Sequence, residues 1–169
     1  MTIDVALAGA GAFGIKHLDA MSQIDDVNVV SVVGRTLEPT REVAERYGID
    51  HVTTDLAESL ALSEVDAVVL ATPTQMHAEQ SIACLEAGKH VEVEIPLCDN
   101  LADGRRVAEA QQRTGLVAMV GHTRRVNPSH QWIHRRVRSG EFIIQQMDVQ
   151  TYFFRRTNTN ALGQPRSWT

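Results

Sequence analysis

The 169-residue sequence has few cysteines and no long hydrophobic run, and each shortage excludes a class of protein. Its two cysteines, Cys84 and Cys98, cannot build the disulfide framework of a small secreted protein, and they fit a reducing cytoplasm. No apolar stretch approaches the roughly 18–20 residues that span a bilayer. The N-terminus also lacks the basic start of a signal peptide. We therefore expect a cytoplasmic protein that does not enter a membrane.

Aromatic residues are scarce as well, and the charge is unevenly distributed. The aromatic content of 5% is low for a protein that stacks nucleic-acid bases. Residues 1–121 carry a net charge of −11, whereas residues 122–169 carry eight arginines, no lysine and a net charge of +6. Because the arginine fork binds carboxylates and phosphates with two parallel hydrogen bonds, this tail predicts a small anionic ligand. Nucleic-acid binding by residues 122–138 is the distant alternative.

Apolar runs alternate with helical patterns through residues 1–121, which is typical of parallel βαβ units. The sequence therefore predicts a Rossmann domain of class α/β, with a doubly wound parallel sheet. The expected strands are 3–8, 27–34, 51–53, 67–71, 90–94 and 116–120. The expected helices are 12–21, 38–47, 56–61, 75–87 and 101–114, with Thr74 and Asn100 as N-caps.

The pattern changes in residues 122–169, which we expect to begin an incomplete second α/β domain. A helix is predicted from Pro128 to Arg138, followed by one long strand over residues 142–154. A strand without partners leaves its backbone groups unpaired, so we expect the chain to be the N-terminal part of a longer protein. The alternative is that this strand joins the main sheet or packs on itself.

A glycine-rich loop follows the first expected strand and opens the first expected helix. The loop has the G-x-G-x-x-G pattern of a dinucleotide site, in which the glycines permit a tight turn, close approach of a diphosphate and close helix packing. The diphosphate would lie at the positive end of the helix dipole. The residues expected to contact it are Gly9, Gly11, Ala12, Phe13 and Gly14.

The end of the second strand predicts which dinucleotide binds. NAD enzymes place a carboxylate here to bind the ribose hydroxyls, but this sequence has Arg35 and Thr36 after Gly34. A guanidinium at this position suits the 2′-phosphate of NADP. The sequence therefore predicts NADP as cofactor. The alternative is that Arg35 points into solvent and Glu38 binds the ribose hydroxyl.

Three later segments, residues 71–77, 94–96 and 121–128, follow the glycine loop in a specific order and spacing. Together these segments resemble the glucose–fructose oxidoreductase/inositol dehydrogenase (Gfo/Idh/MocA) family of NAD(P)-dependent oxidoreductases. The resemblance implies an NADP-binding Rossmann domain at residues 1–121 and a substrate and oligomerisation domain that begins at residues 122–169. It also implies that the full-length protein is a homo-oligomer. The resemblance implies that the turn at Thr72 and Pro73 carries the cofactor and that Glu94 lies by the nicotinamide. His77, one turn into the helix that follows, is a further expected cofactor contact, with a structural role as the alternative.

One position departs from the family pattern and narrows the range of expected substrates. Family members usually have Glu-Lys-Pro where this chain has Glu94-Ile95-Pro96, and an isoleucine cannot transfer a proton. This departure argues against a simple sugar or polyol dehydrogenase, although that activity stays open as an alternative, as does a cofactor-binding module without turnover. Segments 72–80, 93–97, 121–125 and 145–156 resemble a branch that oxidises ring-cleavage semialdehydes as cyclic hemiacetals, with NADP as acceptor.

The residues expected to serve this chemistry follow from the charge of such a substrate. A dicarboxylate needs cations, and in an extended strand only one of two adjacent side chains faces the site. His122 and Glu94 are the candidate acid/base groups, with orientation of a substrate carboxylate as the alternative role of His122. The histidines show no metal-binding spacing. The expected substrate contacts are Arg124, Arg125, Tyr152, Arg155 and Arg156.

Overall fold

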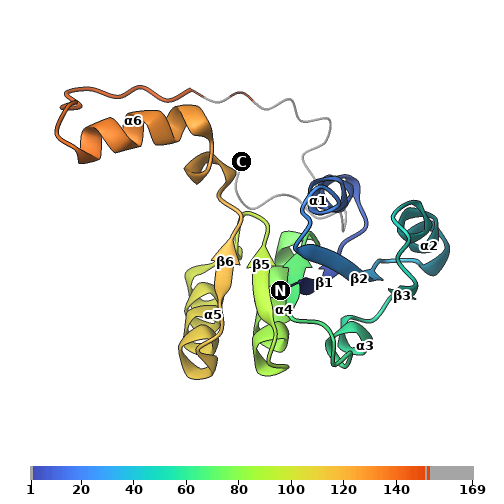
Figure 1. Cartoon of the computed structure of the whole chain (residues 1–169). Helices are drawn as coiled ribbons and strands as arrows, with labels where there is room; N and C mark the ends of the chain where they lie inside the picture. Colours follow the sequence, from blue (N-terminus) through green and yellow to red (C-terminus); the bar gives the residue numbers. More distant parts are fainter. Residues whose placement is uncertain (1, 151, 153–169) are drawn as a thin grey trace. The chain divides into compact units, whose positions relative to one another are not determined.

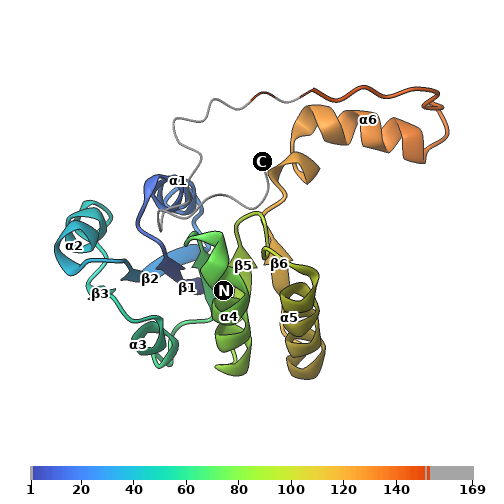
Figure 2. The same cartoon turned by 180° about the vertical axis from the view of Figure 1, so that it is seen from behind.

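The alternating apolar runs form one six-stranded parallel sheet, drawn as arrows in Figures 1 and 2. The computed structural model describes residues 2–150 and 152. The sheet has the strand order β3-β2-β1-β4-β5-β6, which is the doubly wound order of a Rossmann fold. The strands are β1 (Ile3–Ala8), β2 (Val27–Val33), β3 (His51–Thr53), β4 (Ala67–Leu70), β5 (His90–Val93) and β6 (Ala118–Val120). The predicted fold class is thus confirmed.

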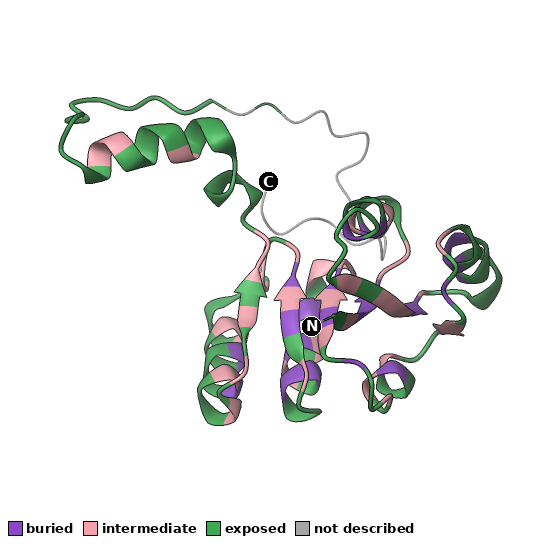
Figure 3. Cartoon of the chain, in the orientation of Figure 1, coloured by how far each residue is buried: buried purple, intermediate pink, exposed green. Residues whose placement is uncertain are grey.

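Five helices connect the strands and cover both faces of the sheet. Leu18 of α1 and Val43 of α2 pack into the apolar core of one face. Leu85 of α4 and Ala110 of α5 pack into the core of the other face, with Leu56 of α3 against it. Figure 3 colours buried residues purple, and they lie along the strands and on the helices that pack against them. The helices are α1 (Ala12–Met21), α2 (Leu37–Arg46), α3 (Leu56–Leu60), α4 (Thr74–Glu86) and α5 (Leu101–Thr114).

The helix ends follow local chemistry, with one correction to the prediction. Asn100 caps α5 by accepting a hydrogen bond from the Asp103 amide at 2.9 Å, as predicted. Thr74 was expected to cap α4, but it is the first residue of the helix, because the extended Pro73 occupies the N-cap position. None of the helices in the described part of the chain combines the length and the hydrophobicity that a bilayer crossing needs.

The two cysteines differ in accessibility, and we expect iodoacetamide to label Cys98 while sparing Cys84. Burial raises the pKa of the Cys84 thiol to about 12, so little reactive thiolate forms at a pH of about 8. Cys98 is partly exposed, with its thiol donating to the Asn100 carbonyl. Peptide mass spectrometry after brief labelling measures the difference, and labelling in urea provides the control. Equal labelling of both thiols in the folded chain would contradict the described core.

A second compact unit begins at His122. Its described part contains a short 3-10 helix, η1 (Thr123–Arg125), and the helix α6 (Pro128–Arg138). Asn127 caps α6 by accepting from the amides of Ser129 and His130, and Pro128 occupies the first turn. The helix is therefore placed as predicted.

The long strand predicted over residues 142–154 is not formed in the part that the structure describes. Residues 142–150 have no regular structure, and residues 151, 153 and 154 lie outside the described residues. A strand requires a neighbour for its backbone hydrogen bonds. In the described residues, Phe142 instead packs edge-on against Trp132 with ring centroids 5.7 Å apart, and Arg136 stacks on Trp132 at 3.8 Å.

Candidate functional site

The strand order places the candidate site at the carboxyl ends of β1 and β4, where the direction of winding reverses. Ligands of doubly wound sheets bind in the crevice at this point. The loops after β1, β2, β4 and β5 all begin at this edge, so they bring together residues that are far apart in the sequence. Each of the predicted cofactor residues in the first unit belongs to one of these four loops or to the start of the helix that follows it.

The glycine loop after β1 has the backbone that its sequence predicts. Gly9 has a φ of 109°, and an added Cβ would lie 2.4 Å from the Ala71 carbonyl oxygen, so only glycine fits there. A Cβ on Gly14 would lie 1.8 Å from the Gly9 carbonyl oxygen. These two glycines let the loop lie against β4 and let α1 lie against the loop.

Gly11 differs from the other two glycines of the loop, because the space beside it is open. A Cβ on Gly11 would meet nothing within 4 Å, although its φ of −82° suits any residue. Gly11 is the N-cap of α1, and no side chain caps this end of the helix. Ala12 starts the helix, and Phe13 is 61% exposed beside the ammonium of Lys16. Open space at an uncapped helix N-terminus fits a diphosphate.

The loop after β2 presents Arg35 and Thr36 at the surface. Both residues are exposed, and the Thr36 carbonyl accepts the Thr40 hydroxyl at 2.7 Å, which fixes the start of α2. The guanidinium of Arg35 forms no ion pair with any described residue. Glu38, the alternative ribose contact, is 77% exposed and pairs with Arg41 at 3.3 Å. Of these two candidates, only Glu38 is already engaged by a neighbouring side chain.

His77 joins the turn after β4 to the turn after β5. The residue is 1% exposed, its Nδ1 lies 2.8 Å from the Pro96 carbonyl oxygen, and its Nε2 lies 2.7 Å from the Thr72 carbonyl oxygen. The Thr72 hydroxyl donates to Gln80 of α4 at 2.5 Å. Both imidazole nitrogens therefore face backbone carbonyls beneath the two turns.

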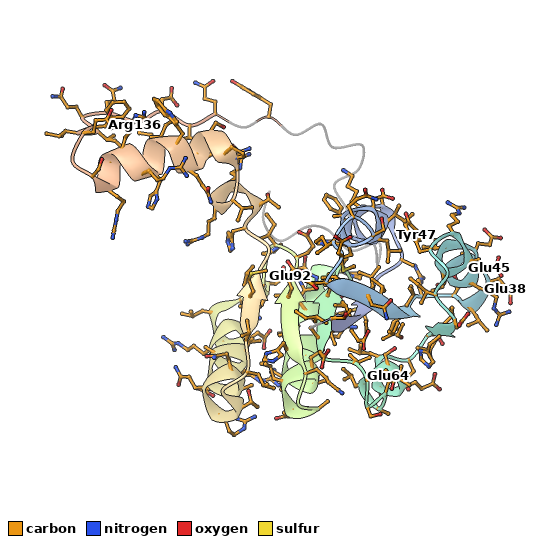
Figure 4. The ribbon with its side chains drawn as sticks, in the orientation of Figure 1. Glu38, Glu45, Tyr47, Glu64, Glu92 and Arg136 are labelled. Atoms are coloured by element: carbon orange, nitrogen blue, oxygen red, sulfur yellow. The ribbon has the colours of Figure 1, made fainter. Side chains whose placement is uncertain are left out.

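A cluster of three titratable groups lies next to these turns, and the sequence did not indicate it. His17 of α1 and Glu94, which follows β5, approach to 2.9 Å between Nε2 and Oε1. Glu92 of β5 lies two residues before Glu94 and is affected by the charges of both groups, and Figure 4 labels its side chain. Its Oε2 atom is buried without a hydrogen-bond partner among the described residues. His17 and Glu94 are 77 positions apart, so only the fold could reveal this contact.

The pKa of Glu92 is raised, because burial disfavours its charged form and the charge of Glu94 adds to this, while His17 opposes it. Between the ordinary and the raised pKa, the folded chain binds more protons than the unfolded chain. Stability therefore falls as pH rises through this interval, and the full cost is present above it. We expect Glu92→Gln to raise the melting temperature at a pH of about 8 but not at about 4.

Thermal unfolding of both proteins by circular dichroism measures this difference. The matched control is Glu64→Gln, because Glu64 is an exposed carboxylate on the surface of the same unit, also labelled in Figure 4. The control is expected to shift the melting temperature little at either pH. A Glu92→Gln protein that is less stable at the higher pH would contradict the raised pKa.

The segment after β6 carries the remaining candidates. Gly121 packs against β5, since an added Cβ would lie 2.5 Å from Oε1 of Glu92. His122 is exposed and begins the second unit as the N-cap of η1, which contains Arg124 and Arg125. Tyr152 is exposed and donates its hydroxyl to Gln150 at 2.7 Å. Arg155 and Arg156 lie outside the described residues.

The described part of the chain offers no metal centre. No group of three or more His, Cys, Asp or Glu side chains among these residues is arranged to hold an ion. His130 and His134, one turn apart on α6, therefore lack the further ligands that a site requires.

Comparisons with known proteins agree with the Rossmann fold of the first unit. Residues 3–122 match the family described as "Oxidoreductase family, NAD-binding Rossmann fold" (GFO_IDH_MocA), and residues 128–169 match "Bacterial oxidoreductases, C-terminal". The chain is 64% identical over 165 residues to 4-carboxy-2-hydroxymuconate-6-semialdehyde dehydrogenase of Sphingobium sp. strain SYK-6, an alignment that covers 98% of this chain and 52% of that protein. The chain thus spans about half the length of this relative.

Two solved structures share the fold. GenD2 from gentamicin A biosynthesis, in complex with NAD, is 33% identical with a TM-score of 0.68, and the match covers 71% of this chain and 34% of that one. KijD10, a 3-ketoreductase from Actinomadura kijaniata in complex with NADP, is 26% identical with a TM-score of 0.76, covering 83% and 44%. By sequence and by fold, the chain belongs to the Gfo/Idh/MocA oxidoreductase family, whose Rossmann domain binds a nicotinamide dinucleotide.

Proposed function

We propose that this chain is the cofactor-binding part of an NADP-dependent dehydrogenase. Its substrate would be the hemiacetal form of 4-carboxy-2-hydroxymuconate-6-semialdehyde, and its product 2-pyrone-4,6-dicarboxylate, in the degradation of aromatic compounds. The observation that carries this proposal is the 64% identity, over 98% of the chain, to the relative that bears this enzyme's name. Residues 1–121 would bind NADP, and residues 122–169 would begin the domain that holds the substrate and forms the oligomer.

The open space at Gly11 and the uncapped start of α1 support a bound diphosphate. Arg35 supports NADP over NAD, because a guanidinium that is not engaged by a carboxylate can bind a 2′-phosphate. Thr36 lies beside Arg35 at the start of α2, and Thr72, Pro73, His77 and Glu94 would form the nicotinamide end of the site. When bound, NADP supplies the acceptor for a hydride ion.

Oxidation of a hemiacetal hydroxyl also releases a proton, which a group of the chain must accept. The C–H bond gives its electron pair to the hydride, the O–H bond gives its proton to a base, and a lactone carbonyl forms. Glu94 and His122 are the proposed acid/base groups. Ile95 is 51% exposed beside Glu94 and takes no part in proton transfer, which favours a substrate that is easily oxidised over a sugar alcohol.

The substrate carries two carboxylates, and arginine is the side chain that binds them best. Arg124 and Arg125 belong to η1, which begins three residues after the end of β6, and both are exposed. The same family includes polyol dehydrogenases, such as the 30% identical myo-inositol 2-dehydrogenase of Thermotoga maritima. A neutral polyol offers no carboxylate for these guanidinium groups to bind. The remaining proposed contacts are Tyr152, Arg155 and Arg156.

The test has a binding part and a turnover part. Calorimetric titration of the chain with NADP and with NAD measures cofactor choice, and we expect NADP to bind at least about tenfold more tightly. Turnover requires a longer protein, which the chain joined to the C-terminal half of the Sphingobium relative would supply. Formation of the pyrone dicarboxylate by this protein supports the proposal. Oxidation of inositol instead of the hemiacetal would refute it.

A further inference from the structure

We propose that His17 is a positioning residue that holds the Glu94 carboxylate in one orientation at the carboxyl end of β5, above the buried carboxyl of Glu92. This inference deepens the proposed function, in which Glu94 accepts a proton. It assigns a role to His17, which no motif of the sequence singles out.

The first argument is the set of contacts made by Glu94. Its Oε1 lies 2.9 Å from Nε2 of His17, and its Oε2 accepts the amide hydrogen of Ile95 at 3.2 Å. Since one oxygen contacts His17 of α1 and the other accepts from the amide of the next residue, the carboxylate has a fixed plane. A fixed plane presents the remaining lone pairs in a constant direction, as proton transfer requires.

The second argument is exposure. The side chains of His17 and Glu94 are 26% and 17% exposed, so the pair is neither sealed in the core nor free in solvent. A ligand can therefore reach the pair, whereas a purely structural contact would not need this access. The pair joins two segments of the first unit, α1 and the turn after β5, that contribute to the candidate site.

The third argument concerns Glu92, the carboxyl group that completes the cluster with His17 and Glu94. Glu92 lies on β5 and has one buried oxygen without a partner among the described residues. Its other oxygen lies against Gly121, where an added Cβ would come within 2.5 Å. The charges that act on Glu92 are those of His17 from α1 and Glu94 from the end of β5, which shift its pKa in opposite directions. The protonation of Glu92 therefore depends on both neighbouring side chains.

The test uses nuclear magnetic resonance to compare two substitutions of His17 in the 169-residue chain. His17→Leu removes the partner of Glu94, whereas His17→Gln keeps an N–H donor. The Ile95 amide reports on Glu94, because it donates to that carboxylate. We expect its exchange with solvent to rise about tenfold in His17→Leu and to stay within about threefold in His17→Gln. Carboxyl carbon spectra should show Glu92 titrating at higher pH in both variants.

The matched control is Tyr47→Phe, which removes the 2.7 Å hydrogen bond from Tyr47 of the segment after α2 to Asp19 of the same helix α1. Figure 4 labels Tyr47 next to α2. The control should leave Ile95 and Glu92 unchanged. If His17→Leu also leaves both unchanged, the inference is overturned.

The chain joined to the C-terminal half of the Sphingobium relative, here called the completed enzyme, adds a kinetic measurement. We expect His17→Leu to lower kcat by at least about tenfold while the KM for NADP changes less than about twofold, and His17→Gln to recover most of the loss. Equal losses in both variants would count against positioning. If the completed enzyme does not oxidise the hemiacetal at all, the proposed function fails. The resonance experiment still decides the role of His17, because it needs no substrate.

Discussion

Gly11→Ala is expected to remove dinucleotide binding while leaving the fold intact. The backbone of Gly11 is acceptable to alanine, and the new methyl group would meet no protein atom within 4 Å. In the proposed complex, however, the same methyl group would occupy space needed by the diphosphate. We expect the affinity for NADP to fall at least about tenfold, because overpacking of a close contact costs about 1–3 kcal/mol. Calorimetry measures the affinity and thermal unfolding measures stability.

The comparison for Gly11 is Gly14→Ala, in which the added methyl group would lie 1.8 Å from the Gly9 carbonyl oxygen. A backbone oxygen cannot move aside as a flexible side chain can, so this variant should lose stability together with binding. Only the separation of the two effects at Gly11 supports a diphosphate at this position. If Gly11→Ala binds NADP as the parent chain does, the diphosphate lies elsewhere.

The second large effect is expected at Arg35. Arg35→Ser should weaken NADP binding by about 10- to 100-fold, because a charge-assisted bond to a phosphate contributes about 1.5–3 kcal/mol. NAD binding should change little, since NAD lacks the 2′-phosphate. Titration of both dinucleotides into the parent chain and the variant measures the selectivity.

Arg41→Gln is the matched control, because Arg41 is an exposed arginine of the neighbouring helix that pairs with Glu38. This control should keep the preference for NADP. Equal weakening of NAD and NADP by Arg35→Ser would show that the guanidinium attracts the dinucleotide without reading the 2′-phosphate. The proposed cofactor choice would then have to be abandoned.

The fold was predictable because its signals are local. Short apolar strands, helical spacing and glycines with positive φ after helices, such as Gly48 and Gly115, mark each element within a few residues. The glycine loop was predictable for the same reason, since its three glycines lie within six positions of one another. Four of the six strands are shorter than predicted, because pairing with neighbours decides where a strand ends.

The parts that the sequence could not predict depend on distant contacts. No spacing rule connects His17 with Glu94, and burial at Glu92 depends on the packing of Gly121 above it. The predicted strand at residues 142–154 failed in its described part for a related reason. Its composition suits a strand, but backbone pairing requires a neighbour that the described residues do not provide. The roles of the tail arginines and Tyr152 stay predictions.

The buried ring of His77 has a mechanical consequence for the site. A single imidazole, almost fully enclosed, contacts the carbonyl oxygens of both Thr72 and Pro96 at 2.7–2.8 Å. Displacing either turn would move the imidazole that also contacts the other turn. The two turns are therefore expected to shift together. A molecule that binds to one turn would thereby also change the position of the other turn.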